Sequence, residues 1–111
     1  MPIPADPIAA MRKKAAAMPD VHEGTACNQS SFKFGKKSFF FVGPGAKGVG
    51  FKAMFKLNNS IAQAEKLADK KPEVYSVGKN GWVTARFSVD KPLPKSVWEK
   101  WVKEAYEIAA G

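Results

Sequence analysis

The alternation of apolar and polar side chains over residues 49–57, VGFKAMFKL, constrains the fold more than any other feature of the sequence. Side chains of a β-strand point alternately to opposite faces, so one face of this segment would carry Lys52, Met54 and Lys56. The other face would carry the apolar residues Val49, Phe51, Ala53, Phe55 and Leu57. A helix would instead spread the apolar residues around its circumference with both lysines among them. We therefore expect a central or near-central strand of an antiparallel sheet, buried on one side only.

A helix is predicted ahead of this strand, over residues 8–18. Asp6 is a suitable N-cap, Pro7 fits the first turn without losing a hydrogen bond, and Pro19 ends the helix. The predicted apolar stripe recurs at steps of three and four and consists of Ile8, Met11, Ala15 and Met18.

Short strands separated by glycine-containing turns are predicted between residues 25 and 48. They cover residues 25–27, 32–34 and 38–42, with a turn at 28–30, a hairpin turn at 35–37 and a longer loop at 43–48. Strict alternation would point Phe39 and Phe41 into the core and Phe40 to the opposite face, while Lys33 would also face outward.

The second half of the chain predicts a helix, a hairpin and a final helix. Ser60 and Gln63 have the spacing of a capping box, and residues 78–81 form a turn between strands at 74–77 and 82–89. The last helix starts at Pro94 and carries a wide apolar stripe. This order predicts a single α+β domain over residues 1–111, an antiparallel sheet whose helices cover one face and leave the other open and basic.

Positive charge is concentrated in the middle of the chain. Residues 31–57 carry six lysines and no Asp or Glu, whereas the whole chain has a net charge of +8. Such asymmetry indicates an anionic partner, although lysines can also serve solubility alone. The candidate nucleic-acid-binding residues, on the open face and in the flanking turns, are Lys33, Lys36, Lys37, Lys47, Lys52, Lys56, Lys79 and Arg86.

Lysine lacks the planar fork that reads guanine edges, and the chain has only two arginines, so phosphate contacts are expected rather than sequence readout. With ~4 such contacts, affinity would fall by roughly 3.6 decades per decade of salt. DNA is the expected partner, and RNA stays open.

Two aromatic residues, Phe40 and Trp82, are predicted on the open face, where they could stack on bases. They could instead cover a neighbouring strand or bury against a partner subunit. A second hypothesis therefore makes Met54, Phe40 and Trp82 an apolar patch, rimmed by lysines, for an acidic protein or small ligand. Trp98 and Trp101 are expected in the core under the last helix or in a dimer contact, so the chain would be a monomer or weak dimer.

Little in the sequence points to catalysis or to a metal. His22 and Cys27 are each alone in the chain, and no cluster has the spacing of metal ligands. Glu99, Glu104 and Glu107 are expected to be solvated charges on the last helix that pair with neighbouring lysines. We expect a non-enzymatic protein without a cofactor. The lone cysteine favours the cytoplasm, and no apolar run is long enough to span a membrane.

Several motifs resemble the MmcQ/YjbR family of small bacterial proteins. They are Pro19-Asp20-Val21, Glu23-Gly24-Thr25, Phe32-Lys33-Phe34, Lys37-Ser38-Phe39, Phe51-Lys52, Trp82-Val83 and Glu104-Ala105-Tyr106. Phe34 departs from the family pattern, which usually has an aliphatic residue there. The resemblance covers nearly the whole chain and implies a frataxin-like α+β fold. It also implies a proposed "double-wing" DNA-binding surface, in which two hairpins flank a basic face.

Overall fold

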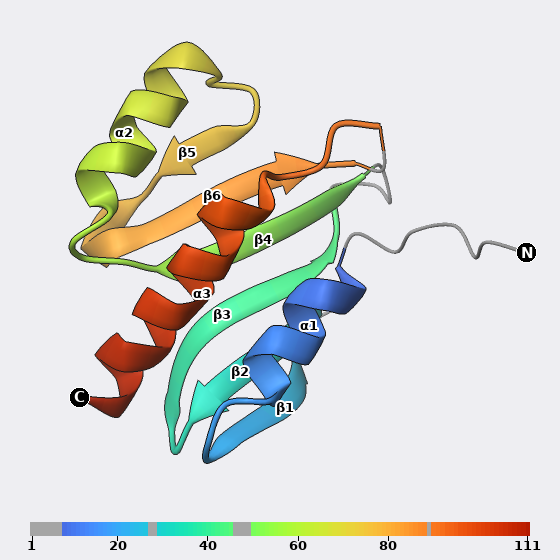
Figure 1. The fold of residues 1–111 in the computed structure, drawn as a ribbon, viewed down its shortest axis with the longest axis vertical. Helices are drawn as coiled ribbons and strands as arrows, with labels where there is room; N and C mark the ends of the chain where they lie inside the picture. The colour runs from blue at the N-terminus through green and yellow to red at the C-terminus, as the bar shows by residue number, and fades with distance from the viewer. Residues whose placement is uncertain (1–7, 27–28, 46–49, 89) are drawn as a thin grey trace, which may run out of the picture.

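A computed structural model describes residues 8–26, 29–45, 50–88 and 90–111. It shows a six-stranded antiparallel sheet in the order β1-β2-β3-β4-β6-β5, with three helices packed against it (Figure 1). The elements are α1 (Ala9–Ala16), β1 (Val21–Ala26), β2 (Gln29–Phe34), β3 (Lys37–Pro44), β4 (Phe51–Lys56), α2 (Ile61–Lys70), β5 (Tyr75–Val77), a 3₁₀ turn η2 (Lys79–Gly81), β6 (Trp82–Phe87) and α3 (Lys95–Ala110). The predicted α+β class with one antiparallel sheet is confirmed.

The central strand is β4, which pairs with β3 on one side and β6 on the other. Ala53 and Phe55 are fully buried and Leu57 is nearly so, which confirms the predicted apolar face. Lys52 lies opposite Arg86 and Lys56 lies opposite Trp82 in the antiparallel ladder. Because cross-strand partners point to the same face, all four side chains leave the sheet on the side away from the buried residues.

Helices α1 and α3 cover the apolar face of the sheet (Figure 1). Trp101 is fully buried on α3, where its ring meets Phe55 edge-on at 5.4 Å and Tyr75 at 5.9 Å between centroids. Trp98 is also buried, at 6% exposure, so the two α3 tryptophans belong to the core of this chain. These edge-to-face contacts add about 1 kcal/mol each to the burial of the rings.

A β-bulge in β3 overturns the predicted position of Phe40. Phe32 pairs with Phe40, but the next residue of β2, Lys33, pairs with Ser38, so Phe39 is the extra residue of the bulge. Phe39 and Phe40 are therefore both fully buried, and the ring of Phe40 stacks between those of Phe32 at 5.4 Å and Phe55 at 5.1 Å. Beyond the bulge it is Phe41 that points to the open face. The prediction that Phe40 lies on that face is therefore wrong.

Other predicted boundaries shift by a few residues. Strand β1 begins at Val21 rather than at residue 25, and β2 begins at Gln29, inside the predicted turn at 28–30. The predicted N-cap Asp6, together with Cys27, Lys47, Val49 and Val89, lies outside the described residues. No helix among the described residues is long and apolar enough to cross a membrane.

The start of α2 is held by a carboxylate from another helix, not by the predicted capping box. Glu104 of α3 accepts hydrogen bonds from the backbone amides of Asn58 at 2.9 Å and Ser60 at 3.0 Å, and from the Ser60 hydroxyl at 2.6 Å. Gln63, the expected box partner, instead accepts the indole N–H of Trp101 at 3.3 Å. The free amides at the start of a helix favour an anion, so Glu104 does for α2 what a local cap usually does.

These contacts also set the charge of Glu104. Burial raises the pKa of this carboxyl, but the hydrogen bonds from Ser60 and Asn58, with Lys100 nearby, outweigh burial and lower it below its usual value of 4.5. The prediction of a solvated charge was therefore wrong for Glu104, which ties α2 to α3.

The bulge predicts that adjacent phenylalanines differ sharply in their contribution to stability. Phe40→Ala should lower the free energy of unfolding by about 3–5 kcal/mol, because it empties a fully packed site. Phe41→Ala should cost much less, because the side chain of Phe41 is only partly buried. Urea denaturation of the two variants measures the difference, and equal losses would contradict the bulge.

The Glu104 cap predicts a stability difference that depends on pH. At neutral pH Glu104→Gln should lower the free energy of unfolding by about 1 kcal/mol, the usual contribution of a helix cap. Because the folded state lowers the pKa of Glu104, its contribution is present above about pH 4.5 and is lost as the pH falls through the folded pKa. Denaturation should show a difference in unfolding free energy between the wild type and Glu104→Gln at pH 7 that becomes smaller at pH 3. The control Glu107→Gln, at an exposed position of the same helix, should show no gap at either pH.

Candidate nucleic-acid interface

The sheet face opposite the helices carries four cations from three strands. The ladder places Lys52 and Lys56 of β4 beside Arg86 of β6, and Lys33 of β2 points the same way because its neighbour Phe32 is in the core. The only carboxylate in the described strands is Glu23 of β1, which lies opposite Phe32 and therefore faces the helices. It pairs there with Arg12 of α1 at 2.7 Å. The described strands thus bring no negative charge to this face.

Two of these cations lie directly opposite each other. Lys52 and Arg86 are cross-strand partners, and neither forms an ion pair within the described residues. Like charges in this position destabilise a sheet, whereas an opposite-charge pair contributes roughly 0.2–1 kcal/mol. Both side chains, with Lys91, line a cavity of about 420 Å³ at this end of β4 and β6. A bound anion would relieve the repulsion.

The other end of the face combines a cation with aromatic rings. The amine of Lys56 lies 5.7 Å from the centroid of the Trp82 ring and donates a hydrogen bond to the carbonyl of Asn80. The Trp82 ring lies 5.5 Å from that of Phe41, with 50° between the ring planes. Lys37, Lys56 and Trp82, together with Ile108 and Ala109 of α3, line a cavity of about 330 Å³ at this end of the sheet. Cation–π contact of this kind keeps the lysine extended over the ring.

The turn at residues 78–81 brings further lysine to this end of the sheet. The amide of Leu57 donates to the carbonyl of Gly81 at 2.8 Å, so the turn lies against the end of β4. Gly81 has φ of 82°, and a Cβ there would stand 2.3 Å from the carbonyl oxygen of Leu57, so glycine is required. Lys79 is exposed on this turn, and Lys36 and Lys37 are exposed at the β2–β3 hairpin.

The predicted site residues are therefore brought together in part. The open face and its two turns hold Lys33, Lys36, Lys37, Lys52, Lys56, Lys79, Arg86 and Trp82, while Lys47 lies outside the described residues. Phe40 does not belong to the site, and Phe41, which the sequence reading assigned to the core, takes its place beside Trp82. The run of three phenylalanines at residues 39–41 departs from strict alternation, but it does not show which of the three faces outward.

Groups of three or more His, Cys, Asp or Glu residues that could hold a metal are absent from the described residues. His22 is exposed on β1, opposite Lys33. The arrangement offers positive charge and partly exposed apolar rings, which suit an anion that also has flat apolar surfaces.

Comparison with known proteins supports the fold. The crystal structure of Deinococcus radiodurans protein DR2400, with the family domain DUF419, superposes with a TM-score of 0.72 at 16% sequence identity. The alignment covers 97% of this chain and 81% of that one. No curated protein matches the sequence. The sequence model named YjbR matches residues 16–108, which is most of the chain. The chain therefore belongs to the YjbR family.

Proposed function

We propose that this protein is a non-enzymatic nucleic-acid-binding protein that contacts backbone phosphates through the open face of its sheet, with little sequence specificity. The observation that carries the proposal is the register of β4 with β6. It gathers Lys52, Lys56 and Arg86 on one face, and no carboxylate of the described strands accompanies them. Phosphate neutralisation by lysine and arginine supplies most of the affinity in sequence-indifferent binding.

The spacing of the cations suits a nucleic-acid backbone. Lys52 and Lys56 are four residues apart in β4, which corresponds to about 13 Å along an extended strand. At the rise of about 3.4 Å per nucleotide of a stacked strand, that distance spans about four nucleotides, and a strand with splayed bases would cover it with fewer. Arg86 and Lys33 extend the same charge sideways across β6 and β2. The turns that carry Lys36, Lys37 and Lys79 would flank the bound strand.

The aromatic pair favours single-stranded over double-stranded nucleic acid. Phe41, Met54 and Trp82 are only partly buried and lie on neighbouring strands between the cations. Bases can stack on such rings only when they are unpaired and splayed from the backbone, and each stacked base contributes about 1–3 kcal/mol. A duplex would reach the lysines but not the rings.

The same patch also fits the alternative function, docking of an acidic protein. Phe41, Met54 and Trp82 would then be buried against the partner's apolar residues while lysines meet its carboxylates. If the protein binds an acidic protein but does not bind oligonucleotides, this second function is favoured.

Charge reversal at position 52 should affect binding and stability in opposite directions. Lys52→Glu replaces a repulsive pair with an ion pair to Arg86, so the fold should gain about 0.5 kcal/mol. Binding of a mixed-sequence oligonucleotide should weaken, and the salt slope should fall by about 0.9 from a wild-type value near 3.6. Fluorescence anisotropy over a salt series measures binding, and urea denaturation measures stability.

A matched control carries the same change of charge elsewhere. Lys66 is exposed on α2, away from the open face, so Lys66→Glu should leave the salt slope unchanged. Equal weakening by Lys52→Glu and Lys66→Glu would mean that only net charge matters. That result would remove the proposed site.

Replacing the aromatic rings by apolar side chains should weaken binding of single strands but not of duplexes. Phe41→Leu and Trp82→Leu should each weaken binding of a single-stranded oligonucleotide about tenfold, the loss of one stacking contact. Duplex binding should change little, because it depends on the lysines. The control is Thr84→Val. Thr84 lies on the same face in β6, which is flanked by β4 and β5, and its replacement should change the affinity for neither single strands nor duplexes. The stacking account would be wrong if both substrates lost affinity equally.

A further inference from the structure

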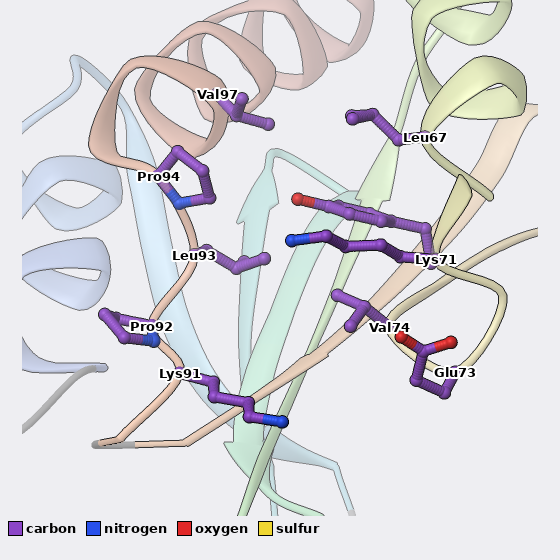
Figure 2. A pocket seen from close by; sticks show the side chains of 10 residues that line it. Leu67, Lys71, Glu73, Val74, Lys91, Pro92, Leu93, Pro94 and Val97 are labelled. Atoms are coloured by element: carbon purple, nitrogen blue, oxygen red, sulfur yellow. The ribbon is translucent and has the colours of Figure 1, made fainter. Parts of the chain in front are cut away.

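A second cavity, on the helix side of the sheet, lies between α2 and α3. Its volume is about 540 Å³, within the usual range of small-molecule sites. The lining residues that bear on its chemistry are Leu67, Lys71, Tyr75, Lys91, Leu93 and Val97 (Figure 2). It adjoins the cavity beside Lys52 and Arg86, because Val74 and Lys91 line both.

The way the helices are tied explains why this space is not filled. Glu104 and Gln63 join α3 to the first turns of α2, but no hydrogen bond or ion pair joins the described parts of the helices beyond that end. At the far end Leu67 of α2 and Val97 of α3 face the cavity from opposite sides (Figure 2). Both side chains are only partly buried. Their apolar surface, which closer packing of the two helices would cover, therefore remains accessible.

Tyr75 gives this apolar space a hydrogen-bond donor. Only 4% of the residue is exposed, and its ring packs against Trp101. Its hydroxyl forms no hydrogen bond in the described part of the chain. Because no buried side-chain oxygen or nitrogen there lacks a partner, this hydroxyl is accessible from the cavity that Tyr75 lines. Burial raises the pKa of Tyr75, so the hydroxyl remains protonated at neutral pH and can donate.

Two lysines add positive charge at the same place. Figure 2 shows Lys71 extending its amine across the cavity toward Leu93, with Lys91 on the facing loop. Neither amine forms an ion pair in the described residues, even though Glu73 stands at the rim. One carboxylate against two ammonium groups leaves the lining with a net positive charge.

We propose that this cavity binds a small anion with an apolar body, such as an aromatic or medium-chain carboxylate. The carboxylate would accept hydrogen bonds from the Tyr75 hydroxyl and the Lys71 amine, with Lys91 as a second cation. The body would lie against Leu67, Leu93 and Val97. A few convergent polar groups in a mostly apolar cleft are the general pattern of such sites. This proposal does not depend on nucleic-acid binding.

The probe for the test is 4-phenylbutyrate, with the neutral 4-phenylbutan-1-ol as its analogue. The full chain is titrated with 4-phenylbutyrate while its amide chemical shifts are monitored by NMR. Saturable shift changes are expected at Leu67, Lys71, Val74 and Val97. Tyr75→Phe and Lys71→Met should each raise the dissociation constant about five- to tenfold, as expected for loss of a charge-assisted hydrogen bond. The alcohol should bind more weakly than the carboxylate by a similar factor.

Controls make the result specific to the cavity. Lys66→Met removes an exposed lysine of α2, the helix that ends next to Lys71, and should leave the dissociation constant unchanged. Val97→Trp should abolish binding by filling the space, while the shift pattern of the sheet reports that the fold is intact. The proposal is overturned if no saturable change occurs at millimolar concentrations. It is equally overturned if the alcohol binds as well as the carboxylate, or if Val97→Trp binds normally.

Discussion

The pairing of β4 on both of its edges is the constraint on which the rest of the structure depends. A strand hydrogen-bonded on both sides cannot rotate, so its alternation decides which side chains enter the core and which leave it. Ala53 and Phe55 are packed under α3, and this fixes Lys52 and Lys56 on the opposite face. A shift of the β4 register by one residue would bury two ammonium groups and expose the phenylalanines. The free-energy cost of both changes would destabilise the fold.

Periodicity predicted most of the fold because it reflects this constraint directly. The central strand, the Trp82 strand and the apolar stripe of α3 all follow from patterns of two or of three and four. Phe40 was misplaced because a bulge interrupts the period of two, and local sequence does not show where an extra residue is inserted. The burial of two adjacent phenylalanines is decided by the fit of Phe39 and Phe40 under the helices, which is a tertiary effect.

The cap of α2 could not be predicted for a related reason. Ser60 and Gln63 have the spacing of a capping box, yet both are engaged by α3. Glu104 is 44 residues away from Ser60, and its neighbours in sequence are those of any solvated helix. Contacts between distant residues leave no periodic trace, whereas the cations of the open face could be foreseen because alternation alone sets their direction.

The fold thus presents two chemically different surfaces on opposite sides of one sheet. The helix side has a cavity where α2 and α3 diverge, with the Tyr75 hydroxyl and two lysines around apolar side chains. The open side is broad, and its described strands carry cations and partly buried rings without acids. Extended polymers suit the second surface and compact anions suit the first, and the two meet at Val74 and Lys91, which line cavities on both.

The central claim, that the open sheet face meets nucleic acid, is tested most directly by mapping the contact itself. A mixed-sequence single-stranded oligonucleotide would be titrated into the ¹⁵N- and ¹³C-labelled chain while amide and side-chain signals are followed. The account predicts the largest changes at Lys52, Met54, Trp82 and Arg86, with α1 and α3 unaffected. Changes confined to the helices, or no saturable change at low salt, would contradict it.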